Sequence, residues 1–414
     1  MTETAAAPLP RRRAAAGFIV TTVAIDAMGI GLILPVMPEL LKQIGGFDVS
    51  QAALWGGMLA FSYAAMNFLF GPLLGNLSDR HGRRPVLLAS LAVLCVDYLV
   101  MAAAQSLWLL LVARIAAGIA GATYSTANAY LADISPPEKR AANFGLVGAG
   151  FGIGFVFGPA IGGLLGELGP RAPFLAAAGL CAVNVVFGWL VLPESLPPER
   201  RRPFELRRSD PFSAIRDVGR LPQVRWLAAA LFVYALGHSV YPAVWSFYAL
   251  AAFGWSPAQI GASLAAIGVA MALSQGLLIR VLLRRFGEVG TIALGLGANL
   301  LAMAGLAIIG QGWVVYAGLP LFALGVVVGP ALNGLMSGRT GPDEQGRLQG
   351  VLGALQGVTA IAAPLLFTGV FRAFTDADAA LFWPGAPFAV SGLLIGLTAA
   401  TLALGLRRER QSKR

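Results

Sequence analysis

Long apolar stretches alternate with short polar ones along the whole chain. Twelve stretches of about twenty residues or more are dominated by aliphatic, aromatic and small side chains, and basic or proline-containing segments separate them. A helix of this length can cross the hydrocarbon core of a bilayer, where backbone groups must be hydrogen-bonded within the protein. The pattern predicts an all-α integral membrane protein with twelve transmembrane helices at 15–38, 52–77, 86–104, 107–132, 143–166, 172–192, 224–250, 258–282, 290–310, 313–337, 347–371 and 385–406.

Composition supports the same class of protein. The chain has 414 residues, of which 57% are hydrophobic and only 12% are charged. Soluble domains keep about a quarter of their residues charged. Cys95 and Cys181 lie inside predicted spans, so neither is expected to form a disulfide or to bind a metal. The chain has no nucleotide-binding loop and no metal-ligand spacing, and we expect it to use no cofactor and no metal.

A single long polar segment divides the chain. Residues 193–223 are rich in proline and charge, and the apolar pattern stops there. Six predicted spans precede this segment and six follow it. We therefore expect an N-terminal six-helix half (1–192), a cytoplasmic linker (193–223) and a C-terminal six-helix half (224–414).

The two halves carry the marks of an internal repeat. An offset of 205 residues matches Gly82 with Gly287 and, far from that loop, Pro159 with Pro364. Two distant segments that share one offset support a repeat better than either segment alone. We expect two pseudo-symmetric halves with a binding site between them near the membrane midplane.

Basic residues gather on one side of the predicted membrane. Of the 30 Lys and Arg residues, Lys42, Arg171 and Arg372 fall on the opposite side and Arg114 lies within a span, which leaves 26 on the side of the termini. Short loops rich in Lys and Arg face the cytoplasm. We expect a multi-pass inner-membrane protein with both termini cytoplasmic, and the net charge of +10 does not require a nucleic-acid partner.

Three charged side chains lie inside predicted spans. The helical rise places Asp26 about 14 Å into the first span, Asp97 about 18 Å along the third and Arg114 about 20 Å above the inner face of a core about 30 Å thick. A static ion pair is one interpretation. The interpretation that we favour is proton coupling, with Asp26 as the main carrier and Asp97 and Arg114 as tuners. A carboxylic acid in a dry site keeps its proton, whereas one that is wetted or faces a guanidinium releases it.

The loop between the second and third spans reads DRHGRR (79–84). Gly82 permits a tight turn, and Asp133 at the inner end of the fourth span is a candidate partner for Arg83. Cytoplasmic positive charge alone explains the arginines. The functional interpretation is a cytoplasmic gate that holds the outward-open state, made of Asp79, Arg80, Gly82, Arg83 and Asp133.

Glycines recur every four residues in the fifth span. Gly154, Gly158 and Gly162 share one helix face, which permits close packing, and Pro159 removes one backbone hydrogen bond. Helix packing alone explains this spacing. A smooth, tightly packed face also suits a seal against proton leak.

Several polar side chains inside the spans are candidates for a substrate-binding cavity. Polar groups in a membrane face protein or water, and any one of them is as well explained by hydrogen bonding between helices. The candidates are Asn67, Asn128, His238, Gln275, Asn299 and Gln356.

These motifs resemble a known family. The loop motif and the fourth-span motif are similar to those of the major facilitator superfamily, and the fifth-span motif resembles that of its antiporter branches. The first and third spans resemble those of the tetracycline/proton antiporters and related drug exporters. The segments are GNLSDRHGRRPVLL (75–88), RIAAGIAGA (114–122), GFGIGFVFGPAIGG (150–163), IDAMGIGLILPVMPELL (25–41) and VDYLVMAAAQSLWLL (96–110).

The chain departs from the tetracycline exporters at two positions. That group carries a His in the eighth span and an acid in the ninth, where this chain has Met271 and Asn299. The resemblance implies that those residues handle protons and recognise the drug–cation chelate. The departures therefore bear on which drug is exported.

The resemblance implies a proton-coupled drug exporter of tetracycline-like or other amphipathic antibiotics. The alternative is a proton-coupled symporter, or an exporter of a metabolite that is not a drug. An intramembrane enzyme is disfavoured because the sequence has no HExxH motif and no plausible Ser–His pair. The expected partners are a small-molecule drug, protons and membrane lipid, and we expect a monomer.

Overall fold

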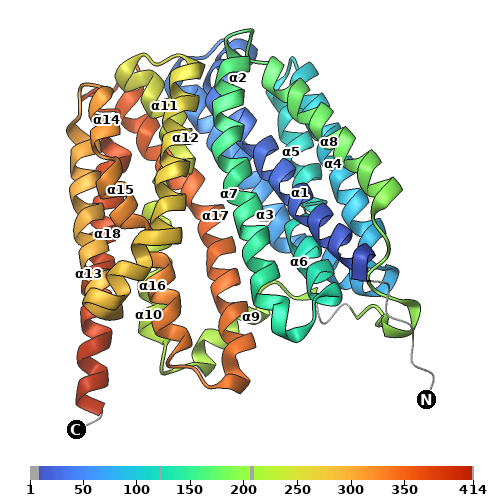
Figure 1. Cartoon of the computed structure of the whole chain (residues 1–414). Coiled ribbons are helices and arrows are strands. Elements are labelled where there is room, and N and C mark those ends of the chain that lie inside the picture. The colour runs from blue at the N-terminus through green and yellow to red at the C-terminus, as the bar shows by residue number, and fades with distance from the viewer. Residues whose placement is uncertain (1–8, 122, 206–208, 413–414) are drawn as a thin grey trace.

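The computed structural model describes residues 9–121, 123–205 and 209–412 of the chain, and within these residues it contains helices and no strands. The first described helix begins and the last described helix ends at the same end of the helical bundle (Figure 1), which we call the terminal end, and the opposite end is the distal end.

Helices of the first half begin with α1 and end with α8. The chain passes from α1 through a short 3₁₀ turn (Leu34–Val36) into α2 at the distal end. The bounds are α1 (Leu9–Ile33), α2 (Met37–Gly45), α3 (Val49–His81), α4 (Arg83–Ala103), α5 (Leu107–Ile119), α6 (Thr123–Ile134), α7 (Pro137–Gly166) and α8 (Ala172–Val191).

A short helix, α9 (Ser213–Arg216), lies in the polar segment, and the second half follows. A π-helical turn at Ser274–Leu278 joins α12 to α13. The bounds are α10 (Arg225–His238), α11 (Val240–Phe253), α12 (Pro257–Leu273), α13 (Ile279–Ile308), α14 (Trp313–Ala317), α15 (Leu319–Val326), α16 (Val328–Ser337), α17 (Gln345–Thr375) and α18 (Ala386–Ser412).

The twelve predicted spans are all present. Among the described residues, 10 helical segments are long and apolar enough to cross a membrane. One of these, Pro257–Ile308, covers two predicted spans and changes direction at Gly287. The pair α5 and α6, which is not among the ten, covers the span predicted at 107–132.

Besides the spans that contain the 3₁₀ turn at Leu34–Val36 and the π-helical turn at Ser274–Leu278, three predicted spans are divided between separate α-helices. The span at 224–250 breaks at Ser239, and that at 313–337 breaks at Gly318 and Val327. Each break lies two or three residues before a proline, and a proline ring clashes with the carbonyl group four residues earlier. The third break, between α5 and α6, lies at the glycine pair Gly118 and Gly121, where α3 packs closely.

The repeated positions have the same backbone geometry. Gly82 has a φ of 106° and Gly287 a φ of 67°, so both matched glycines occupy the half of φ space that other residues rarely adopt. Pro159 and Pro364 both lie inside long helices, α7 and α17. The offset found in the sequence therefore relates equivalent places in the structure.

Two helix pairs join the halves. The helix α3 packs along α17, and α7 packs along α12. At the distal end this contact is tight: a Cβ added to Gly163 would lie 2.5 Å from the Pro257 carbonyl oxygen. The Ser246 hydroxyl of α11 also donates to the Leu34 carbonyl oxygen at 2.8 Å. The distal end is therefore closed.

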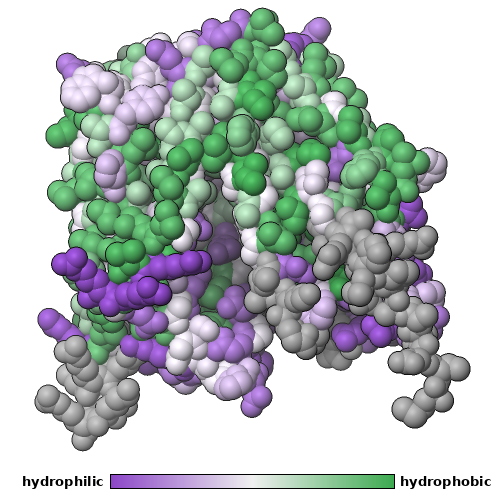
Figure 2. Space-filling view, in the orientation of Figure 1, coloured by the Kyte–Doolittle hydropathy of each residue, from purple (hydrophilic) through white to green (hydrophobic). Residues whose placement is uncertain are grey.

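The terminal end is open between the halves. Figure 2 shows the surface hollowed there, below a broad apolar band, with hydrophilic residues around the opening. Two cavities lie along this opening, one deep between the halves and one at its mouth beside α3 and α17.

Candidate functional site

The deeper cavity lies between the two halves and has a volume of about 370 Å³. Helices α1, α3, α4 and α5 line it on one side, and α11 and α17 line it on the other. Its titratable wall residues are Asp26, Tyr63, Tyr98 and Arg114, all from the first half. The wall residues from α11 and α17 carry no titratable side chain, so the charge of this cavity is one-sided.

An ion pair stands behind the wall of the cavity. The Arg114 Nε–H of α5 donates to Asp97 Oδ1 of α4 at 3.3 Å, and the second guanidinium nitrogen pairs with Oδ2. Asp97 is 3% exposed and does not line the cavity. The Arg114 guanidinium also lies over the Tyr63 ring, 5.5 Å from its centre. The Arg114 guanidinium therefore has two partners: its N–H groups pair with a carboxylate, and it also lies over an aromatic ring.

Asp26 differs from Asp97 in its surroundings. Among the described residues, its buried Oδ1 atom has no hydrogen-bond partner. A carboxylate oxygen in this position is costly unless the group is protonated or meets water. The structure thus brings two of the three predicted charges, Asp26 and Arg114, to one cavity and places Asp97 behind them as the partner of Arg114.

The glycine face of α7 packs against α1. A Cβ added to Gly158 would lie 2.6 Å from the Met28 carbonyl oxygen, and Gly154 and Gly162 lie equally close to backbone atoms of α1. Gly31 of α1 meets the Pro159 ring in the same seam. The backbone of α1, which carries Asp26, is therefore held directly by α7.

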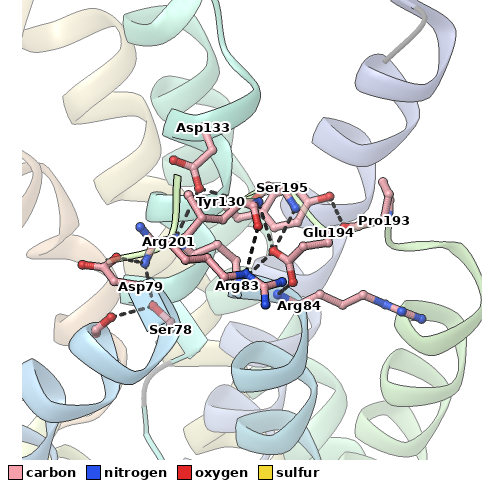
Figure 3. A network of polar contacts seen from close by, with 12 residues as sticks. Ser78, Asp79, Arg83, Arg84, Tyr130, Asp133, Pro193, Glu194, Ser195 and Arg201 are labelled. Atoms are coloured by element: carbon pink, nitrogen blue, oxygen red, sulfur yellow. Dashed lines mark hydrogen bonds and ion pairs between the residues drawn. The ribbon is translucent and has the colours of Figure 1, made fainter. Parts of the chain in front are cut away.

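A network of charges lies at the terminal end of the first half (Figure 3). Arg83 pairs with Asp79 at 2.5 Å and with Asp133 at 3.2 Å, and it donates to the Ser78 hydroxyl at 2.6 Å. The Ser195 hydroxyl reaches the same Asp133 oxygen. The predicted partner of Arg83 is therefore in place, and Arg80 is exposed and lies outside this network.

Glu194 is the central acid of the network, and the sequence alone did not single it out. Its carboxylate accepts from the backbone N–H groups of Arg83 at 2.8 Å and Arg84 at 3.3 Å, and so caps the start of α4. A Cβ on Gly82 would collide with this carboxylate. The position of Glu194, three residues after the end of α8, was the available signal.

Three predicted cavity residues pack within the bundle instead, two of them through hydrogen bonds and His238 through ring contacts. Asn67 of α3 donates to the Gly121 carbonyl oxygen at 2.7 Å and satisfies the break between α5 and α6, although it also lines the mouth. Asn299 is fully buried and donates to the Gly325 carbonyl oxygen at 3.0 Å, away from both cavities. His238 lies among aromatic rings, stacked on Tyr234.

The remaining three polar candidates do not line the deep cavity. Gln275 is exposed in the π-helical turn, and Gln356 is exposed on α17. Asn128 is half-buried on α6. The sequence gives the depth of a polar residue within a span, but it does not show which face of the helix points to a cavity. The six polar candidates therefore lie in different environments in the structure.

The mouth cavity has a volume of about 510 Å³. It is lined by α3, by glycines of α17 and by Asp210, Pro211 and Ser213 of the polar segment. The Phe212 ring packs edge-on against the Phe68 ring at 5.7 Å. The pKa of Asp210 is below its usual value, because the Phe212 backbone N–H and the Arg216 side chain donate to its carboxylate.

The fold and the cavity define a transporter rather than an enzyme, and comparison with known proteins agrees. The family model of the Major Facilitator Superfamily matches residues 19–364, and the chain belongs to this superfamily. The twelve membrane spans, some of which consist of two or three of the labelled helices, form the two six-helix halves of that fold.

Within the superfamily, the chain belongs with the tetracycline resistance proteins. It is 43% identical over 365 residues to the class C tetracycline resistance protein of Escherichia coli, and the matched region covers 88% of this chain and 91% of that protein. It is 39% identical over 389 residues to the class G protein of Vibrio anguillarum, covering 92% and 95%.

Solved structures show the same fold. The human organic anion transporter MFSD10 matches with a TM-score of 0.66 and 26% identity, covering 95% of this chain and all of that one. A bacterial homologue of the human lysosomal transporter Spinster, in an inward-facing and occupied conformation, matches with a TM-score of 0.78 and 16% identity over 97% of this chain and 98% of that one.

Proposed function

We propose that this chain is a proton-coupled exporter of tetracycline-like or other amphipathic drugs. The observation that carries the proposal is the Asp26 carboxyl group, which lines the central cavity and whose buried Oδ1 atom has no hydrogen-bond partner among the described residues, while Arg114 of the same wall is paired with Asp97. A group that gains and loses a proton must not be locked in a permanent ion pair. Asp26 meets this condition and Asp97 does not.

The cycle that we propose is alternating access. The terminal end faces the cytoplasm, as the basic loops favour, so the open cavity described here is the inward-facing state. Drug binds between the halves from the cytoplasm, the halves rock, and the drug leaves on the outer side. Asp26 takes up a proton when the cavity faces outward and releases it when the cavity faces inward.

The network around Arg83 contributes to this cycle as a gate. All of its described ion pairs lie within the first half, and none crosses to α17 in the open terminal end. We propose that Asp79, Gly82, Arg83 and Asp133 engage the second half when the terminal end closes. Glu194 holds the start of α4 in register for that contact.

The decisive experiment is transport in inverted membrane vesicles. Wild-type vesicles with an acidic interior should accumulate tetracycline, and an uncoupler should abolish the uptake. Asp26→Asn should reduce uptake to the level seen with the uncoupler, because the amide cannot carry a proton. The matched control is Thr21→Val, which removes an exposed polar group one turn earlier on α1 and should transport like the wild type.

Two outcomes would contradict the proposal. If wild-type vesicles accumulate no tetracycline-like drug, the chain does not export drugs of this class. Undiminished transport by Asp26→Asn, in protein that elutes as a folded species, would remove Asp26 from proton coupling.

A further inference from the structure

The two cavities meet at one large side chain. Tyr63 of α3 and Ala360 of α17 line both the mouth cavity and the central cavity, and no other residue that the structure describes lines both. Ala360 is small, so the Tyr63 ring forms most of the boundary. A drug that moves from the mouth into the central cavity must pass this ring.

The same ring is a partner of the buried ion pair. The Arg114 guanidinium lies 5.5 Å from the centre of the Tyr63 ring and is paired with Asp97. A guanidinium over an aromatic face is attracted to it, and more strongly away from water. Displacement of the ring therefore removes one of the two interactions that position Arg114.

The backbone of Tyr63 is fixed, and its side chain lines both cavities, with the hydroxyl end beside the break between α5 and α6, where a Cβ added to Gly121 would lie 3.2 Å from the hydroxyl oxygen. A Cβ added to Gly118 of α5 would lie 2.6 Å from the Tyr63 carbonyl oxygen, so α3 and α5 touch at this point. The ring extends from this contact between two cavities. Movement at Tyr63 is thus a rotation of the side chain rather than of the helix.

This inference rests on the proposed function: we propose that Tyr63 couples the passage of drug to the protonation of Asp26. Drug at the junction displaces the Tyr63 ring from Arg114, and Arg114 then turns from the ring toward the cavity that it shares with Asp26. A cation brought toward a carboxyl group favours loss of its proton. Drug binding and proton release are linked in this way, with Tyr63 as a positioning residue.

The charged and titratable groups around this junction are few. Asp26 comes from α1, Tyr98 from α4 and Arg114 from α5, with Asp97 behind Arg114. The helices α11 and α17 of the second half present no titratable side chain to the central cavity. On the other side of the junction, Asp210 of the polar segment lines the mouth cavity and pairs with Arg216. Within the central cavity, the link between drug and proton therefore passes through groups of the first half.

The test measures how the affinity for tetracycline depends on pH in the purified full-length protein. When drug binding releases one proton, the Kd falls about tenfold for each unit rise in pH. Wild-type Kd values are measured between pH 5.5 and 8.5, after correction for the ionisation of tetracycline itself. The variants are Tyr63→Leu, which removes the ring, and Tyr63→Phe, which keeps it.

The matched control is Phe68→Leu. Phe68 lies on the same helix and lines the mouth cavity, and its ring packs against Phe212. We expect Tyr63→Leu to flatten the dependence to less than about twofold per pH unit, and Tyr63→Phe to retain the wild-type slope. Phe68→Leu should shift the Kd at every pH and leave the slope unchanged.

The possible results separate this inference from the proposed function. A wild-type slope in Tyr63→Leu overturns the inference alone, as does an equal loss of slope in Phe68→Leu. Loss of slope in Tyr63→Phe also overturns it, because the hydroxyl group rather than the ring would then be responsible. A wild-type protein that binds no tetracycline at any pH overturns the proposed function and this inference with it.

Discussion

At the scale of single residues, the three charges within the bundle differ in how they are compensated. Asp97 and Arg114 neutralise each other, and Arg114 has an aromatic face as a second partner. Asp26 has neither. In a low-dielectric interior the paired groups resist any change of charge, whereas the unpaired carboxyl group can exchange its proton when water enters. This difference explains why two acids of the same half are suited to different tasks.

Gly82 is subject to two constraints at once. Its φ of 106° is disfavoured for other residues, and its missing side chain leaves room for the Glu194 carboxylate. We expect Gly82→Ala to lower stability by about 1–3 kcal/mol through backbone strain, and to lower the Tm of the detergent-solubilised protein. Gly75→Ala is the control, because Gly75 is helical and has open space at its Cβ position. Equal Tm values for the two variants would rule out this explanation.

The sequence predicted those site residues that stand out by their charge alone. Asp26, Asp97 and Arg114 are conspicuous because each interrupts an apolar run. Glu194 and Tyr63 were missed for a physical reason. An acid in a polar loop and an aromatic residue in a membrane helix are common, and their importance comes from what the fold brings near them.

At the scale of helices, proline and glycine determine the departures from simple spans. The sequence predicted the twelve spans, because length and hydropathy are properties of local composition. The breaks at Ser239, Gly318 and Val327 were not predicted, although each precedes a proline. A membrane helix can hold a proline if its neighbours satisfy the freed backbone groups, so a proline does not by itself locate a break.

The seam between α1 and α7 gives a prediction at the same scale. Gly158→Ala places a methyl group against the Met28 carbonyl oxygen and should force the two helices apart, at a cost of about 1–3 kcal/mol. We expect a lower Tm and a faster passive proton leak in proteoliposomes with an imposed pH gradient. Gly152→Ala on the same helix meets nothing within 4 Å and should behave as the wild type. If both variants leak equally, the seam is not the seal.

At the scale of the whole molecule, the two ends are held by different means. The distal end is closed by backbone contact between α7 and α12 and by hydrogen bonds across the halves. The terminal end is open, and the described charges there pair within one half. The repeat and the two halves were predictable from the sequence offset. Which end is open was not, because alternating access requires one sequence to support both states.

Glu167 is the charged contact across the closed distal end. The pKa of its carboxyl group is below the usual value of 4.5, because the Ser256 hydroxyl and the Ala258 backbone N–H donate to the carboxylate. The contribution of Glu167 to closure is therefore present above its ordinary pKa and is lost as the pH falls through the lowered value. Acidification through this lowered pKa should therefore loosen the distal end.

The measurement is the distance between spin labels on Leu168 and Ala262, exposed residues on either side of this contact, with Cys95 and Cys181 replaced by alanine. The wild type should keep a short distance at pH 7 and lengthen at low pH. Glu167→Gln should already show longer distances at pH 7 and no acid transition.

The control for Glu167 is another acid at the same end. Glu39→Gln removes a carboxylate that pairs with Lys42 inside the first half, and it should follow the wild type at every pH. A short distance that persists through acidification in both the wild type and Glu167→Gln would show that Glu167 does not contribute to closure.

The matched glycines Gly82 and Gly287 also bear on the history of the chain. Both keep a positive φ at the same place in their halves, yet Gly82 is crowded by a carboxylate and Gly287 has nothing within 4 Å of its Cβ position. A duplicated half-length ancestor accounts for the shared turn. After duplication, one copy kept an acid, Asp79, before the turn, whereas the other has Arg284 at the matching position. The second copy is thus a position where asparagine or a short insertion should be tolerated, and where a reporter can be added without disturbing the first.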